Sequence, residues 1–304
     1  MAVQLPVHLS APGLTSRPLA PGDVDAVYRL VAAAEVHDIG EVEVDLEDII
    51  GDWQRPSFRI EEQSVGIEAQ GLLVAYAEVF GGRYADAQVL PEHRGRGIGS
   101  ALARWTQEEA RRQGGSLVGM PVPLGSDGDR LLTRLGYHVR WTSWVLALPP
   151  GTSIPAQPLP EGYTVREMQG GEEHTAYRLT EDAFNEWPDR TPASYEDWAA
   201  EVFHRPGFEP WQLRLVVDPS GTAVGVSFVV LSKGCGYIYR LAVRRDRRGL
   251  GLGRALLADS FAQARARGAT RSELSTDSRT GALGLYERVG MQVTQTWLHR
   301  AIEV

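Results

Sequence analysis

The sequence contains 304 residues, enough for two ordinary domains that each bury a hydrophobic core. Hydrophobic residues make up 43% and charged residues 23%, without an apolar run long enough to cross a bilayer, so we expect a globular protein with no membrane partner. A formal net charge of −8 argues against a nucleic-acid partner, and one cysteine with scattered histidines argues against a disulfide framework or a bound metal. The first residues lack the basic and apolar stretches of a signal peptide, which favours a cytoplasmic location.

The first half of the chain contains two apolar segments typical of strands, at residues 72–79 and 85–90. A glycine-rich stretch, RGRGIG at residues 94–99, comes next and leads into a predicted helix over 100–113, which ends before Gly114. The following apolar segment carries Pro121 and Pro123, and we expect these prolines to disrupt strand pairing there.

A proline-rich segment separates the two halves. It covers residues 149–162 and has five prolines within twelve positions. Proline fixes the backbone φ angle and removes an N–H donor, so this segment cannot continue a helix or a central strand. We therefore predict an extended and fairly stiff connector between two domains.

The second half repeats a similar series of elements. The sequence predicts a strand at 163–166, then helices over 172–185 and 195–203. Two strands at 213–217 and 223–231 flank the turn DPSG, which is typical of a hairpin. A strand at 237–243 and a helix from 253 to about 267, stopped by Gly268, complete the series.

The two halves share a short repeat at a fixed offset. RGRGIG at residues 94–99 and RGLGLG at residues 248–253 lie 154 residues apart. The same offset brings Leu131 onto Leu285 and Gly136 onto Gly290, whereas Leu132 corresponds to Tyr286. A repeat of this length indicates a duplicated domain, and the mismatch suggests that one copy alone performs chemistry.

Each repeat places an Arg-x-x-Gly-x-Gly turn between a strand and a helix. Glycines allow close approach of a ligand, and the first amides of a helix lack internal partners, so this turn is typical of a pyrophosphate site. The P-loop and dinucleotide-binding patterns do not match either copy. A tight turn with glycines for packing is the structural alternative, and two copies in matched context argue against it.

Taken together, these motifs resemble the GCN5-related N-acetyltransferase (GNAT) family, with a tandem arrangement like that of the mycothiol synthases. A second family segment is matched by ALGLYERVGM at residues 282–291. The resemblance implies an α/β (α+β) fold with two GNAT-type domains, each a mixed, splayed, mostly antiparallel sheet flanked by helices. Their expected bounds are 1–148 for an N-terminal, non-catalytic domain, 149–162 for the connector and 163–304 for a catalytic domain.

The resemblance also implies acetyl-coenzyme A as co-substrate and assigns residues to it. In the second copy these are Leu241, Ala242, Val243, Arg248, Gly249, Leu250, Gly251, Leu252, Gly253 and Arg254. In the first copy they are Val89, Arg94, Gly95, Gly97, Gly99 and Ser100. Because its loop is intact, the first domain can either bind coenzyme A or serve as an empty scaffold.

A direct attack of an amine on the thioester is the mechanism that the resemblance implies. The strand that holds Val243 would splay from its neighbour near residues 273–276, and a backbone amide near Val243 would stabilise the oxyanion. Tyr286 would give its proton to the departing thiolate. The alternative is that Tyr286 has no catalytic role and packs against the sheet as an ordinary helix residue. Leu132 cannot donate a proton, so we expect catalysis in the C-terminal domain.

The acceptor side is less defined by the sequence. Tyr237 stands where the resemblance places a glutamate base, and Tyr237 and Tyr239 either line the acceptor site or pack in the core. Acidic candidates for the base are Glu181, Asp182, Glu186 and Asp189. We expect an N-acetyltransferase that acts on a small-molecule primary amine, as a monomer or homodimer and without metal; the alternatives are a non-catalytic acetyl-coenzyme A sensor and a protein or peptide acetyltransferase.

Overall fold

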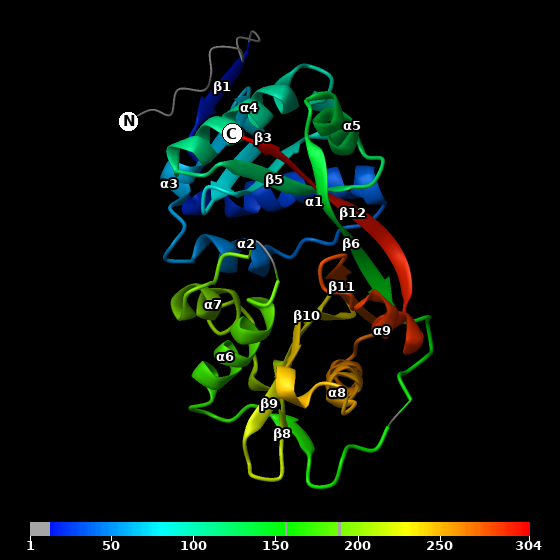
Figure 1. Ribbon diagram of the computed structural model, residues 1–304. Coiled ribbons are helices and arrows are strands. Elements are labelled where there is room, and N and C mark those ends of the chain that lie inside the picture. Colours follow the sequence, from blue (N-terminus) through cyan, green and yellow to red (C-terminus); the bar gives the residue numbers. More distant parts are fainter. Residues whose placement is uncertain (1–12, 156, 188–189) are drawn as a thin grey trace. The chain divides into compact units, whose positions relative to one another are not determined.

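The computed structural model describes residues 13–155, 157–187 and 190–304 (Figure 1). Contacts divide the chain into two compact units. The first contains the chain up to Thr142 with His204–Pro206 and Trp297–Val304, and the second contains Ser143–Phe203 and Gly207–Thr296. Each unit is a mixed, mostly antiparallel sheet flanked by helices, which confirms the predicted α/β fold class.

The sheet of the first unit has the strand order β1-β2-β3-β4-β5-β12. Its strands are β1 (Leu14–Arg17), β2 (Ser64–Ala69), β3 (Leu72–Phe80), β4 (Tyr84–Val89), β5 (Leu117–Pro123) and the end of β12 (Gln292–Glu303). The helices of this unit are α1 (Val24–Ile39), α2 (Leu46–Trp53), α3 (Ile60–Gln63), α4 (Ile98–Arg112), α5 (Asp127–Arg134) and the short 3₁₀ turns Pro21–Asp23 and Pro91–His93. The predicted helix after the first glycine loop is therefore confirmed as α4.

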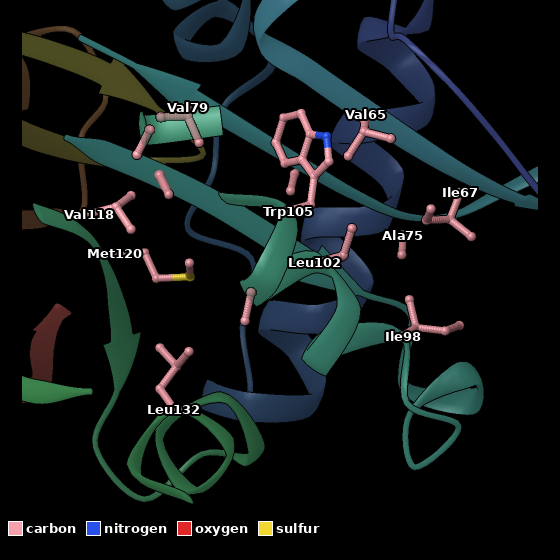
Figure 2. Close-up of a cluster of buried hydrophobic side chains, with 14 of the residues drawn as sticks. Val65, Ile67, Ala75, Val79, Ile98, Leu102, Trp105, Val118, Met120 and Leu132 are labelled. Atoms are coloured by element: carbon pink, nitrogen blue, oxygen red, sulfur yellow. The ribbon is translucent and has the colours of Figure 1, made fainter. Parts of the chain in front are cut away.

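Two apolar cores cover the two faces of this sheet. On one face α4 packs against β2, β3 and β5, and Figure 2 shows its Ile98, Leu102 and Trp105 among the strand residues Ala75 and Val79. On the other face α1 packs against β3. Alternation along β3 explains the division, because successive side chains of a strand point to opposite faces.

The second unit contains the strands in the order β6-β11-β10-β9-β8-β7. They are β6 (His138–Ala147), β7 (Thr164–Glu167), β8 (Leu213–Val217), β9 (Ala223–Ser232), β10 (Cys235–Val243) and β11 (Arg271–Asp277). Its helices are α6 (Glu173–Phe184), α7 (Tyr195–Glu201), α8 (Leu252–Ala266), α9 (Leu283–Arg288) and the 3₁₀ turns Pro210–Gln212 and Arg245–Arg247. These elements match the predicted strands and helices within two residues at most ends, and α8 ends before Gly268 as expected.

Two neighbouring strands of the second unit, β10 and β11, diverge as predicted. β10 and β11 pair in parallel from Cys235 with Arg271 to Ile238 with Leu274, and no pairing of them extends beyond Leu274 among the described residues. The C-terminal part of β10, including Leu241 and Val243, therefore has a backbone edge that faces a gap rather than a neighbouring strand.

Each sheet also contains a strand segment from a distant part of the sequence. In the first unit, Trp297–Glu303 of β12 pairs antiparallel with β5. In the second unit, Ser143–Ala147 of β6 pairs antiparallel with β11. Thus the last residues of the chain complete the first sheet, and residues that precede the connector complete the second.

The expectation that Pro121 and Pro123 disrupt pairing is wrong. β5 pairs with β12 through both prolines, with Pro121 opposite His299 and Pro123 opposite Trp297. The amide of Gly119 points toward β4, where it donates to the Arg83 carbonyl at 3.0 Å. Because amide directions alternate along a strand, the backbone nitrogens of residues 121 and 123 point to this same side. The pairing of β4 with β5 within the described residues is that of Tyr84 with Gly119, so no N–H is needed beyond it, where the two strands splay apart.

Candidate active site

The C-terminal glycine loop has a backbone that requires glycine. Gly249 and Gly251 have φ angles of 80° and 79°, in the left-handed region that residues with a Cβ rarely adopt. Gly251 is the N-cap of α8, and its carbonyl accepts the amide of Ala255 at 3.1 Å. The amides of Leu252, Gly253 and Arg254 precede this first helical bond, so they remain available for an anion, aided by the helix dipole.

The N-terminal loop repeats this geometry. Gly95 and Gly97 have φ angles of 75° and 83°, Gly97 is the N-cap of α4, and its carbonyl accepts the amide of Ala101 at 3.1 Å. The sequence repeat is therefore a repeat of backbone conformation, and both units contain a strand–turn–helix cradle suited to phosphate.

The first arginine of each motif fixes its loop rather than reaching freely into solvent. The Nε atoms of Arg94 and Arg248 donate to the carbonyls of Val89 and Val243 at 3.1 and 3.0 Å. The Arg94 guanidinium also binds both carboxylate oxygens of Asp38, at 2.6 and 2.9 Å.

Arg248 makes the corresponding pair with Glu186, at 2.9 and 2.8 Å, and this guanidinium lowers the pKa of the Glu186 carboxyl. Both arginines therefore tie the turn to the end of the preceding strand and to an acidic residue near the end of a helix. Their charge is already balanced before any phosphate binds.

A cavity of about 800 Å³ lies over the C-terminal loop. It brings together nine of the ten residues assigned to acetyl-coenzyme A in the second copy, and Tyr286 as well. The tenth, Leu250, has an exposed side chain and is not part of the lining. The remaining walls include Phe184, Trp187, Tyr239, Ser143 and residues 274–277.

A second cavity, of about 600 Å³, lies over the N-terminal loop. All six residues predicted for the first copy line it: Val89, Arg94, Gly95, Gly97, Gly99 and Ser100. Leu132 lines it too, at the position that corresponds to Tyr286.

Tyr286 lies in α9 with only 8% of its surface exposed, and it contacts both the core and the cavity. Burial raises the pKa of its phenol to about 12, because the charged form would lose its solvation. The side chain is therefore a neutral O–H donor at any physiological pH.

The strand beside the cavity differs between the two units. In β10 the register against β9 shifts between Ile238 and Arg240, so Tyr239 forms a β-bulge. In the first unit β4 pairs with β3 in unbroken register over its whole length. The bulge turns Tyr239 into the cavity wall. Tyr237 does not line the cavity, and its ring packs against that of Tyr239 with 4.9 Å between the ring centroids.

The three candidate acids that the structure describes do not supply an unpaired carboxylate at this cavity. Glu181 is buried and bound by the Arg190 guanidinium at 2.7 and 2.6 Å, and Glu186 is held by Arg248. Asp182 is exposed on α6 and is not part of the lining. Asp189 lies outside the described residues.

Several lining residues were not singled out from the sequence. Ser143 precedes the connector, and pairing of β6 with β11 brings it to this cavity. Phe184 and Trp187 stack at 4.5 Å between ring centroids at the end of α6. A local pattern does not encode such long-range placement, although the aromatic residues near the acidic candidates offered a signal.

The described residues contain one group with metal-ligand spacing, formed by His37, Asp38 and Asp127 in the first unit. Its two carboxylates already bind the Arg94 guanidinium, at 2.6 and 3.3 Å. Within the same described part of the chain, no helix is long and apolar enough to span a membrane.

Comparison with known proteins agrees with this geometry. Residues 174–291 match the model of the acetyltransferase (GNAT) family. A mycothiol acetyltransferase of Salinispora arenicola is 33% identical over 240 residues, which cover 73% of this chain and 75% of the relative. That of Salinispora tropica is 32% identical over 244 residues, covering 73% and 75%.

Solved structures extend the similarity to nearly the whole chain. A GCN5-related N-acetyltransferase from Sphaerobacter thermophilus has 30% identity and a TM-score of 0.76, with 96% of both chains covered. A tandem GNAT protein from the clavulanic acid biosynthesis pathway has 17% identity and a TM-score of 0.71, with 95% of this chain and 98% of that chain covered, which shows a shared fold. The chain thus belongs to the GCN5-related N-acetyltransferase family and is an acyl-coenzyme A-dependent N-acetyltransferase whose co-substrate is acetyl-coenzyme A.

Proposed function

We propose that this enzyme transfers the acetyl group of acetyl-coenzyme A to a primary amine of a small molecule, and that catalysis belongs to the domain expected at residues 163–304, whose cavity also includes Ser143. The observation that carries the proposal is the C-terminal cavity. Within the described residues, it alone combines a glycine cradle, a bulged and splayed strand, and the Tyr286 phenol. The small-molecule acceptor is suggested by relatives named for acetylation of mycothiol.

Binding of the co-substrate would use the backbone first. The free amides at the start of α8 hold the pyrophosphate, and the unpaired edge of β10 between Leu241 and Val243 pairs with the pantetheine arm as an added strand would. A backbone amide near Val243 would then point at the thioester carbonyl and stabilise the oxyanion that forms when the amine attacks.

Tyr286 would protonate the sulfur as the carbon–sulfur bond breaks. A phenol with a pKa of about 12 is a weaker acid than an ordinary tyrosine, with a pKa near 10, so donation accompanies rather than precedes departure of the sulfur. The benefit of the raised pKa is that the proton is always present. The paired states of Glu181 and Glu186 favour an amine that enters in its neutral form, or a proton path through water, over direct deprotonation by either residue.

We further propose that the N-terminal domain binds acetyl-coenzyme A without turning it over. Its glycine loop and cavity match those of the catalytic domain, but Leu132 supplies no proton and β4 has no bulge. A purely binding or sensing role for the whole chain would require the C-terminal cavity to be inactive as well.

The test is an assay of acetyl-coenzyme A with a broad panel of small amines, run in parallel on wild type and Tyr286→Phe. We expect transfer to at least one amine, and a decrease in kcat of about 10²–10⁴-fold in the variant with little change in co-substrate affinity. Equal turnover by both proteins would refute the role of Tyr286. Binding of acetyl-coenzyme A without transfer to any amine or lysine-rich peptide would favour the sensing role.

A further inference from the structure

The connector between the two halves does not run free of the second unit. Ile154 is buried in a cluster that contains Leu257 and Phe261 of α8. Five residues later, Leu159 packs against a cluster that contains Leu252 and Leu256 of the same helix. The connector is therefore anchored to α8 on both sides of a short segment.

Two described residues between these anchors, Pro155 and Gln157, lie near the start of α8, where the glycine loop lies. The Nη2 atom of Arg254 donates to the Pro155 carbonyl at 3.1 Å. The Nε2 atom of Gln157 lies 3.9 Å from the place that a Cβ atom on Gly251 would occupy. Pro155 and Pro158 restrict the backbone on either side of Gln157. The backbone at Gln157 therefore loses little conformational entropy when a ligand binds there.

Arg254 marks this place as suited to an anion. Four arginines line the cavity, and Arg247, Arg248 and Arg279 each form an ion pair. Arg254 has no ion pair within the described chain, and its buried Nε–H has no acceptor there either. The loop thus presents an uncompensated cation next to an exposed carboxamide on the connector.

We propose that Gln157 binds coenzyme A, by donating a hydrogen bond from its Nε2 to a phosphate oxygen at the glycine loop. This inference depends on the proposed function and adds to it, because it makes the connector one wall of the co-substrate site. The carboxamide is neutral and carries two N–H donors, so it can contact a phosphate while Arg254 supplies the charge. The connector then contributes affinity as well as joining the two domains.

The test compares two substitutions of Gln157 with a matched control in the full chain. Calorimetric titration with coenzyme A should show binding weakened about fivefold in Gln157→Ala, the equivalent of one lost hydrogen bond, and at least about tenfold in Gln157→Glu, which repels phosphate. Gln157 is placed at the site by its closeness to Gly251, because it is not itself part of the cavity lining. Gln292→Glu adds the same charge at an exposed residue that neither lines the cavity nor lies within 4 Å of a Cβ on Gly251, and it should bind as wild type does. Arg254→Glu should weaken binding at the C-terminal loop, so the binding event that this variant loses in the titration is the one at that loop.

Dephospho-coenzyme A separates the two phosphate sources. If the Gln157 variants also bind this analogue more weakly than wild type does, the contact is to the pyrophosphate. If the difference in affinity disappears with this analogue, the contact is to the 3′-phosphate. Wild-type affinity for coenzyme A in both Gln157 variants, with an unchanged unfolding temperature, would overturn the inference. A wild-type chain that binds no coenzyme A would instead overturn the proposed function.

Discussion

Glu78 should make the stability of the first unit depend on pH. Its side chain is 7% exposed on β3, directly opposite Asp86 on β4, and it accepts the indole N–H of Trp53 at 3.0 Å. Burial first, and then the charge of Asp86, raises the pKa of Glu78 from 4.5 to about 8. The native state therefore keeps a proton that the unfolded state releases at lower pH.

The sign and size follow from this difference in pKa. Below pH 4.5 the group is protonated in both states and adds no pH dependence. As pH rises from 4.5 to 8, the unfolded state ionises first, so stability is progressively lost. A pKa shift of this size lowers the free energy of unfolding, relative to its value below pH 4.5, by about 3 kcal/mol at pH 7 and by about 5 kcal/mol above pH 8.

Glu78→Gln removes the ionisable group while its amide oxygen can still accept from Trp53. We expect the variant to unfold about 6–12 °C above wild type at pH 7, from about 3 kcal/mol in a unit of this size, with a larger gain at pH 8.5 and almost none at pH 4.5. Thermal unfolding monitored across this pH range measures it, with the exposed Glu61→Gln as control. A gain that does not change with pH, or a variant less stable than wild type at pH 8.5, would refute the reasoning.

Two further predictions concern the packing of the first unit. Arg300→Ala removes a guanidinium that binds the partly buried Asp129 carboxylate at 2.5 Å. We expect the free energy of unfolding, measured by denaturant titration, to fall by about 3 kcal/mol, because the carboxylate loses its partner. An unchanged free energy of unfolding would show that this ion pair is dispensable. Gly115→Ala places a Cβ atom 1.8 Å from the Gly82 carbonyl oxygen, so we expect a clear fall in unfolding temperature, whereas Gly22→Ala meets no atom within 4 Å and serves as control. Equal unfolding temperatures for these two alanine variants would show that the backbone at Gly115 moves without cost.

The local parts of the fold were predictable because their signals are local. Glycine-rich turns, strand periodicity and helix stops identified α4 and α8, and the mismatch of Leu132 with Tyr286 needed only the repeat. The sheet edges were not predictable in this way. Trp297–Glu303 pairs with β5 in the first unit, and no residue near either segment indicates that partner.

The same reason explains the error at Pro121 and Pro123. Proline disrupts a strand that must donate on both sides, and the sequence does not reveal that β5 has a partner on one side and a splayed neighbour on the other. At the site, the bulge at Tyr239 was equally hidden, because Tyr237 and Tyr239 alternate in sequence as in any regular strand.

The comparison of the two units separates what binding and catalysis require from the same fold. Binding of phosphate depends on a backbone conformation, and both units retain it at Gly95 with Gly97 and at Gly249 with Gly251. In the mechanism that we propose, catalysis would depend in addition on a register shift in one strand and on a single phenol, and the first unit lacks both at the corresponding positions. Under this proposal a domain loses turnover through few changes while its nucleotide cradle stays intact, and for this reason we propose binding in both units and transfer in the C-terminal one.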